Sequence, residues 1–291
     1  MNLTIFTIDL DDNLSFLKND LVSKVCLNRL EELIKNNTEH TIQFKIFTPR
    51  NKIVQQCMEE FKTYFNLDRV KPVKSLWADV IRMYILSQNS YYLYIDSDIY
   101  FNNLNFLNYL GDKPVSFMAY NFGGLWCTQD KNVYNKILNY YKDLQNYGFE
   151  YIFQKYPKNL NLRKSFYDGD VWTNLDLNED FEILNNINYF HFTSHLFEPH
   201  ENIKFFSVPI NIIDTISNNP DYCNLIYNKN IKLICKDYPY DGLNDKFLLS
   251  SIIRYKNAFE SESDFIKILK MCFPEKTVIT SIDELLKEIA P

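Results

Sequence analysis

Apolar residues along the chain form short runs that alternate with longer stretches of helical spacing. Residues 3–8 and 41–47 are rich in β-branched and aromatic side chains, which predicts two strands. Over 21–36 the apolar residues recur every three or four positions, which predicts a helix between these strands. A second helix is expected over 52–65 and a third strand over 91–101. Strands that alternate with helices predict a parallel sheet with right-handed crossovers, and therefore an α/β fold.

The segment 91–101 is the most informative of these strands. An almost uninterrupted aromatic and aliphatic run leads into Asp96 and Asp98, which are separated by one serine. Because both faces are apolar, we expect a central strand covered by helices. Ligands of such sheets bind outside the carboxyl ends of the strands, where paired carboxylates are costly without a cation between them. Hard oxygen ligands suit Mg²⁺ or Mn²⁺, which bind phosphate oxygens; an acidic turn after a core strand is the alternative.

A helix is expected directly upstream, over 75–86. Asp79 and Arg82 lie three residues apart in it, so they share a helix face and can pair. A short polar break at 87–90 then leads into the strand that ends in Asp-x-Asp. This order of parts is more specific than the Asp-x-Asp motif alone.

The motif Ala-Asp-x-x-Arg-x-x-x-Leu at 78–86, followed by Tyr-Ile-Asp-Ser-Asp at 94–98, resembles a known family. It is similar to GT-A glycosyltransferases that use nucleotide sugars, especially the retaining capsular-polysaccharide, mannosyltransferase and large clostridial toxin branches. The core of the match covers 74–101, and weaker matches extend it from the amino terminus to about residue 200. The resemblance implies a GT-A, Rossmann-like α/β domain, with a mostly parallel sheet flanked by helices.

The resemblance also implies a reaction and roles for these residues. A hexose would pass from a nucleotide diphosphate sugar, with a UDP-sugar favoured, to a hydroxyl of a glycan or other acceptor, with retention. Asp98 would bind Mn²⁺ or Mg²⁺ directly, and Asp96 would reach the ribose or the metal through water. Asp79 and Arg82 would bind the donor sugar.

The loop after the first strand leaves three interpretations open. In GT-A enzymes the corresponding loop covers the nucleotide base and ribose, which Thr7 and Asp9 fit as donor-binding residues. The strand followed by Asp9 and Asp11 also resembles the haloacid-dehalogenase phosphatases, in which the first Asp is the nucleophile. That family expects Thr or Val where Asn13 stands. A helix-capping acidic turn is the third interpretation.

Two later segments resemble the glycogenin and lipopolysaccharide galactosyltransferase group. Asn121, Gly123 and Gly124 match the Asn-x-Gly stretch that lies under the donor sugar, although an ordinary turn is the alternative. Asp168 and Asp170 match the catalytic Asp-Gln-Asp pattern near the anomeric carbon, with glycine in place of the Gln. An Asp-Gly turn into a helix is the alternative for the second segment, for which the functional interpretation is favoured.

His191 is the candidate third metal ligand, because it resembles the His that closes the motif of the same group. The residues after it depart from that motif, and the diphosphate-binding Lys is missing, so Lys204 is a candidate substitute. These departures favour a rival interpretation, a non-catalytic sugar-binding relative with the same fold.

Composition narrows the classes of protein to which the chain could belong. With 291 residues and 46% apolar content, the chain is long and apolar enough for a sizeable core. A net charge of −6 argues against nucleic-acid binding. The six cysteines include no C-x-x-C pair, so buried thiols are expected instead of a zinc site. No apolar run approaches the roughly 20 residues of a membrane span, and a cytoplasmic location is expected.

We expect a catalytic domain over 1–205 and a largely helical extension over 206–291, packed on the core. Short strands near 205–210 and 231–235 would precede two helical stretches, at 244–259 and 263–290. Residues 265–271 are amphipathic with lysine at the edge, so they could contact an anionic membrane surface.

Overall fold

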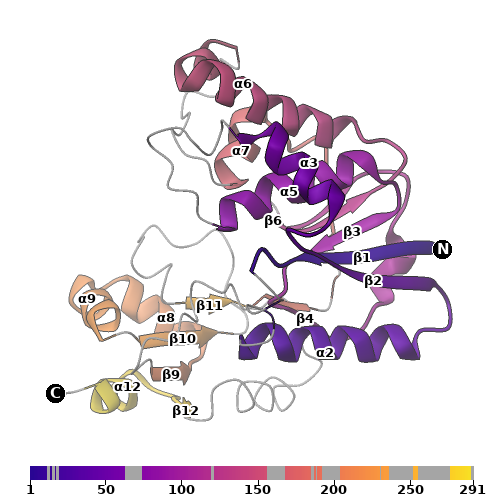
Figure 1. Cartoon of the computed structure of the whole chain (residues 1–291). Coiled ribbons are helices and arrows are strands. Elements are labelled where there is room, and N and C mark those ends of the chain that lie inside the picture. The colour runs from indigo at the N-terminus through magenta and orange to yellow at the C-terminus, as the bar shows by residue number, and fades with distance from the viewer. Residues whose placement is uncertain are drawn as a thin grey trace. The chain divides into compact units, whose positions relative to one another are not determined.

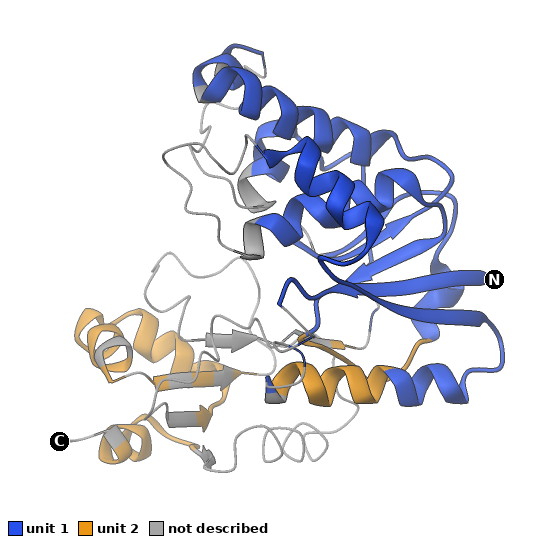
Figure 2. Ribbon diagram, in the orientation of Figure 1, with its two compact units in different colours: residues 1–20, 31–97, 105–187 blue, residues 21–30, 98–104, 188–291 orange. Residues whose placement is uncertain are grey.

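A computed structural model describes most of the chain: residues 1–11, 14, 17, 20–62, 74–118, 121–155, 168–184, 187, 189–191, 204–229, 231–235, 252–254 and 276–289. The chain divides into two compact units (Figure 2). The first unit comprises Met1–Asp20, Glu31–Ser97 and Asn105–Ile187. The second comprises Leu21–Leu30, Asp98–Leu104 and Asn188–Pro291. The boundary therefore falls earlier than residue 205, and two earlier segments join the second unit.

The first unit is built on a six-stranded sheet. Its strands lie in the order β2 (Thr41–Phe47), β1 (Asn2–Ile8), β3 (Tyr92–Ile95), β6 (Asn121–Cys127), β5 (Val115–Met118) and β7 (Glu182–Ile183). Only β6 runs antiparallel to its neighbours. This mostly parallel sheet, flanked by helices, confirms the predicted α/β class.

One face of this sheet carries the main hydrophobic core. The helices α3 (Lys52–Glu60), α5 (Lys74–Gln88), α6 (Asn132–Lys155) and α7 (Asp168–Leu175) lie on that face (Figure 1). Their apolar residues pack with those of β1, β3 and β6 in a single cluster. Three tyrosines of α6, namely Tyr134, Tyr140 and Tyr141, are fully buried in it. The unit also contains the short 3₁₀ helix Asn105–Tyr109.

The predicted central strand over 91–101 is in fact two strands. β3 ends at Ile95, and a turn separates it from β4 (Ile99–Phe101). β4 pairs antiparallel with β8 (Tyr189–His191), within the second unit. The predicted single strand is wrong because the chain leaves the sheet at the polar residues of the Asp-Ser-Asp motif.

The second unit contains a sheet of its own. Four parallel strands lie in the order β11 (Ile252–Arg254), β10 (Ile231–Cys235), β9 (Lys204–Ser207) and β12 (Lys276–Val278). Apolar side chains of α8 (Ile210–Ser217), α9 (Pro220–Asn228) and α12 (Ile282–Ile289) pack in the same core as β9 and β10. The prediction of continuous helix over 244–259 and 263–290 is wrong at β11 and β12. Strands of three residues are too short to show a period of two against a helical pattern.

The helix α2 (Leu21–Asn36) has the predicted bounds and contributes residues to both units. No helix in the described part of the chain is long and apolar enough to cross a membrane. The segment 265–271, predicted to contact a membrane surface, lies outside the described residues. Five of the six cysteines are described, and all five are buried, as expected for core thiols.

Candidate functional site

Two neighbouring parallel strands of the first unit end in carboxylates. Phe6 of β1 lies opposite Tyr94 of β3 in the parallel register, so Asp9 and Asp96 follow at the same edge of the sheet. The backbone N–H of Asp96 donates to the carbonyl oxygen of Gly123, at 2.7 Å. This bond fixes the point at which the chain leaves β3. Ligands of open α/β sheets gather at this edge.

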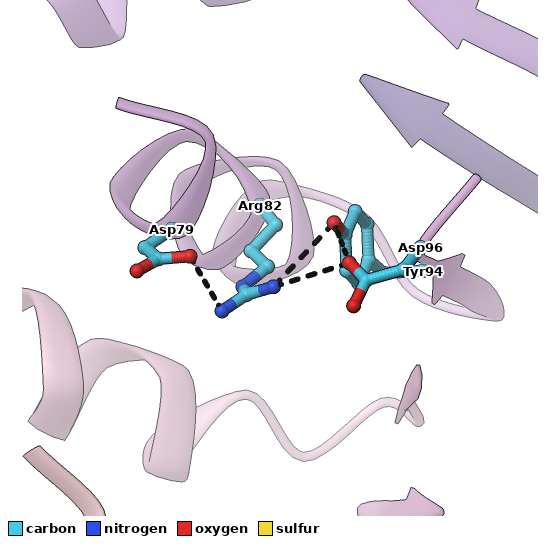
Figure 3. Close-up of polar contacts among 4 residues, drawn as sticks. All are labelled: Asp79, Arg82, Tyr94 and Asp96. Atoms are coloured by element: carbon cyan, nitrogen blue, oxygen red, sulfur yellow. Dashed lines mark hydrogen bonds and ion pairs between the residues drawn. The ribbon is translucent and has the colours of Figure 1, made fainter. Parts of the chain in front are cut away.

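Arg82 of α5 connects two carboxylates at this edge (Figure 3). Its Nη2 lies 2.7 Å from Oδ1 of Asp79, one helical turn earlier, and its Nη1 lies 3.5 Å from Oδ1 of Asp96. The hydroxyl of Tyr94 completes the cluster: it donates to Asp96 and accepts from Nη1 of Arg82 at 3.4 Å. The structure thus brings together Asp79, Arg82 and Asp96, which the sequence predicted as donor-binding residues.

Aromatic rings hold the guanidinium of Arg82 from two directions. Its Cζ lies 5.1 Å from the ring centroid of Tyr94 and 5.6 Å from that of Phe122, which is cation–π distance. Phe122 in turn packs on Trp172 of α7, with ring centroids 5.5 Å apart. The orientation of Arg82 is therefore set by the hydrophobic core as well as by its ion pairs.

The cluster is unevenly buried. The side chain of Arg82 is 4% exposed, whereas those of Asp79 and Asp96 are 15% and 25% exposed. One buried cation between two carboxylates leaves a net negative charge on the exposed side of the cluster. Burial raises the pKa of the Tyr94 hydroxyl well above its usual value, and the charge of Asp96 adds to this rise. The hydroxyl therefore stays protonated and keeps donating to Asp96.

Tyr94 was missed as a site residue in the sequence. A signal for it exists, because residues two apart on a strand point to the same face, and Tyr94 precedes Asp96 by two. Phe122 carries no comparable signal, since its contact with Arg82 depends on the pairing of β6 with β3.

Asp9 is almost fully buried, and its carboxylate accepts backbone hydrogen bonds from the segment that follows β1. Its Oδ1 accepts from the N–H of Asp11 at 2.9 Å, and its Oδ2 accepts from the N–H of Leu17 at 3.2 Å. This geometry favours the helix-capping interpretation over a phosphatase nucleophile, which needs an accessible oxygen. Thr7 is also buried, at 1% exposed, in β1. Contact of Thr7 or Asp9 with a nucleotide stays a prediction.

The glycines of the Asn-x-Gly stretch do not form a turn. Asn121, Gly123 and Gly124 all lie within β6, which corrects the turn interpretation. A Cβ on Gly124 would lie 2.2 Å from Cδ2 of Phe117, so glycine is needed there for close packing between β5 and β6. Gly123 supports the site through its bond to Asp96, and binding of the donor sugar by these three residues stays a prediction.

For the remaining predicted residues, the structure gives the position of the backbone or the burial of the residue. Asp98 is 5% exposed and directly precedes β4, where Ile99 lies opposite His191 in the register. Asp168 and Asp170 lie in the first turn of α7, and their side chains, like that of His191, are outside the described residues. Among described side chains, no group of three or more His, Cys, Asp or Glu is arranged to hold a metal.

No family model matches the chain, and no curated protein matches it either. Among solved structures, the apo form of the glycosyltransferase GlyE from Streptococcus pneumoniae TIGR4 is similar, with a TM-score of 0.38 and 9% sequence identity. The match covers 99% of this chain and 88% of that chain.

Proposed function

We propose that the chain is a metal-dependent glycosyltransferase of the GT-A fold. It would transfer a hexose from a nucleotide diphosphate sugar, with a UDP-sugar favoured, to a hydroxyl of a glycan or other acceptor, with retention. The observation that carries this proposal is the Asp79–Arg82–Asp96 cluster at the carboxyl edge of a mostly parallel sheet. The Asp-x-Asp sequence at 96–98 supports it.

Arg82 has the chemistry to bind a donor. A guanidinium is planar and permanently charged, and it presents several donors in a fixed fork that matches phosphate and sugar oxygens. Here the fork is held in one orientation by Asp79, Asp96 and two aromatic rings, so little side-chain entropy would be lost on binding. Such preorganised donors stabilise charge that develops on a leaving group.

The residues proposed to bind the metal would suit Mn²⁺ or Mg²⁺ by the chemistry of their donor atoms. Asp96 and Asp98 supply carboxylate oxygens, which both ions prefer, and an imidazole such as that of His191 suits Mn²⁺ better than Mg²⁺. When bound, such an ion neutralises a diphosphate as leaving group. Asp168 or Asp170 would position the sugar or the acceptor. A retaining transferase needs no protein base on the acceptor, so the cluster requires no catalytic dyad.

The test uses the full chain with UDP-, GDP- and CMP-sugars, each with and without Mn²⁺, and measures the melting temperature and the release of free nucleotide. A donor at 100 times its Kd adds about 2.7 kcal/mol to the free energy of unfolding. We expect one nucleotide to raise the melting temperature only with metal, and Asp98→Ala and Asp96→Asn to abolish the rise. Asp112→Asn, at an exposed carboxylate, is the matched control and should behave as wild type.

Two outcomes would contradict the proposal. A folded sample that responds to no donor would favour a non-catalytic relative. Hydrolysis of p-nitrophenyl phosphate that survives Asp98→Ala but is lost in Asp9→Asn would identify a phosphohydrolase.

A further inference from the structure

A hollow of about 680 Å³ lies on the surface of the first unit, between α3 and α5. Its lining comes from one face of α3 and one residue of α5: Lys52, Gln55, Gln56, Glu59, Glu60 and Tyr84. The hollow is wide open to solvent, so it is a shallow surface groove and not one of the enclosed pockets of about 300–1,000 Å³ that bury most of a small ligand. Most of the lining residues are polar, although apolar atoms contribute more of the lining surface than polar atoms do.

The hollow is separate from the Arg82 cluster. Successive residues of an α-helix are rotated by about 100°, so Tyr84 points about 200° away from Arg82 around α5. Arg82 is buried, whereas Tyr84 is half-buried at the surface. The helix α5 therefore presents the donor-binding cluster on one side and the hollow on the other.

Lysines outside the lining neutralise both carboxylates of the hollow. Nζ of Lys142, on α6, lies 2.5 Å from a carboxylate oxygen of Glu60, and Lys62 pairs with Glu59 one turn away. The hollow is therefore neither an acidic cluster for a cation nor a basic patch for phosphate. With both carboxylates paired, Lys52 leaves the lining with one positive charge, and its remaining groups are hydrogen-bonding or apolar.

The polar groups that line the hollow match sugar hydroxyls. Each glutamine amide both donates and accepts hydrogen bonds, as a sugar hydroxyl does, and Gln55 and Gln56 are both exposed. The ring of Tyr84 and the methylene groups of Lys52 offer apolar surface for the C–H face of a pyranose. Burial, and then the charge and hydrogen bond of Glu60, raise the pKa of Tyr84, so its hydroxyl stays neutral.

We propose that this hollow is a secondary glycan-binding site, which holds a neutral oligosaccharide away from the reacting centre. The inference rests on the proposed function in one respect, namely that the acceptor is a glycan. A second site of this kind would keep a growing acceptor attached to the enzyme between transfers.

The test is saturation-transfer difference NMR on the full chain with four neutral trisaccharides: maltotriose, cellotriose, mannotriose and chitotriose. We expect at least one to bind, and its Kd to rise about tenfold or more in Gln55→Ala/Gln56→Ala, because each lost hydrogen bond contributes about 1 kcal/mol. Both glutamines are exposed on α3, where alanine favours the helix, so the variant should fold. Asn146→Ala, an exposed carboxamide on α6, is the matched control and should bind as wild type.

The failure of this inference can be distinguished from failure of the proposed function. Absence of binding by all four trisaccharides, or an unchanged Kd in the double variant, overturns the glycan site even where nucleotide sugars still raise the melting temperature. Trisaccharide binding that is lost in the double variant but retained in Asp98→Ala supports the site, whatever the donors do.

Discussion

At the scale of single residues, the candidate site depends on one buried arginine. Arg82 pairs with Asp79 and Asp96, and its guanidinium lies at cation–π distance from the rings of Tyr94 and Phe122. Loss of one partner of a buried ion pair leaves the other charge uncompensated, which is why such clusters tolerate little change. Tyr94 is the neutral member of the cluster, so its hydroxyl can be removed without creating an unpaired charge.

We predict that Tyr94→Phe lowers the free energy of unfolding by about 1–2 kcal/mol at pH 8, through loss of the bonds to Asp96 and Arg82. It should also weaken binding of the donor, because Asp96 and Arg82 lose a positioning contact. The measurement is urea unfolding with donor titration. Gln129→Ala, which removes an exposed bond to the hydroxyl of Tyr91, is the control and should leave donor binding unchanged.

The raised pKa of Tyr94 also predicts how the stability difference between wild type and Tyr94→Phe depends on pH. Burial and the charge of Asp96 raise the pKa of Tyr94 in the folded protein, so the unfolded chain loses this proton first. Stability from the raised pKa is fully present below about pH 10, the unfolded value, and is lost as the pH rises above it. The advantage of wild type over Tyr94→Phe should therefore shrink between about pH 10 and 11. A constant difference across this interval would contradict the assignment.

At the scale of elements, much of the first unit could be predicted because its patterns are local. The alternation of β2 and the helical spacing of α2 are visible within a few residues, and both elements have the expected bounds. The Asp79–Arg82 pair was predictable for the same reason. The contact of Arg82 with Phe122 could not be predicted, because it depends on how β6 pairs with β3 across a long separation in sequence.

Glycine is required in β6 and in α6 for different physical reasons. Gly124 is restricted by contact, since a Cβ would meet the ring of Phe117. We predict that Gly124→Ala destabilises the fold by about 1–3 kcal/mol, the usual cost of overpacking. Gly111→Ala is the control, because a Cβ there has no atom within 4 Å, and it should be close to neutral. Equal unfolding midpoints in guanidinium for the two variants would show that the Phe117 contact is unimportant.

Gly148 is restricted by its backbone instead of by contact. It lies inside α6 with φ of 75° and ψ of −178°, a conformation that side chains of L-residues rarely adopt, although a Cβ there would have no atom within 4 Å. Replacing glycine by alanine in a regular helix stabilises it by about 0.5–1 kcal/mol. Here we predict the opposite sign, a loss of about 1–3 kcal/mol, measured by urea unfolding. A stabilised Gly148→Ala would mean that α6 continues through this position without a kink.

At the scale of the whole molecule, the sequence predicted the α/β class but not the organisation into units. The pattern that predicts a parallel sheet needs strands and helices of ordinary length, which the first unit has. In the second unit, β9 and β10 lie where short strands were predicted, near 205–210 and 231–235. The strands β11 and β12 have three residues each, which is too short for a period of two to be recognised, so this sheet could be predicted only in part. Its inclusion of 21–30 and 98–104 depends on contacts between distant segments, of which the pairing of β4 with β8 is an example.

Each unit has its own hydrophobic core, which leads to a last prediction about how the chain unfolds. Separate cores form separate cooperative units, and a chain with two of them departs from a single two-state transition. Ile137 and Leu233 are both fully buried, the first in the core of the first unit and the second in that of the second. Replacing either by alanine should cost about 2–5 kcal/mol in its own unit.

We expect calorimetry of the full chain to show two transitions, with Ile137→Ala lowering one midpoint and Leu233→Ala lowering the other. Donor contacts with Arg82, Asp79 and Asp96 should raise the transition that Ile137→Ala lowers, because these three residues belong to the first unit. If both variants instead lower one common transition by the same amount, the two cores unfold as a single cooperative unit. Donor binding would then stabilise the whole chain, and the division into units would have no energetic counterpart.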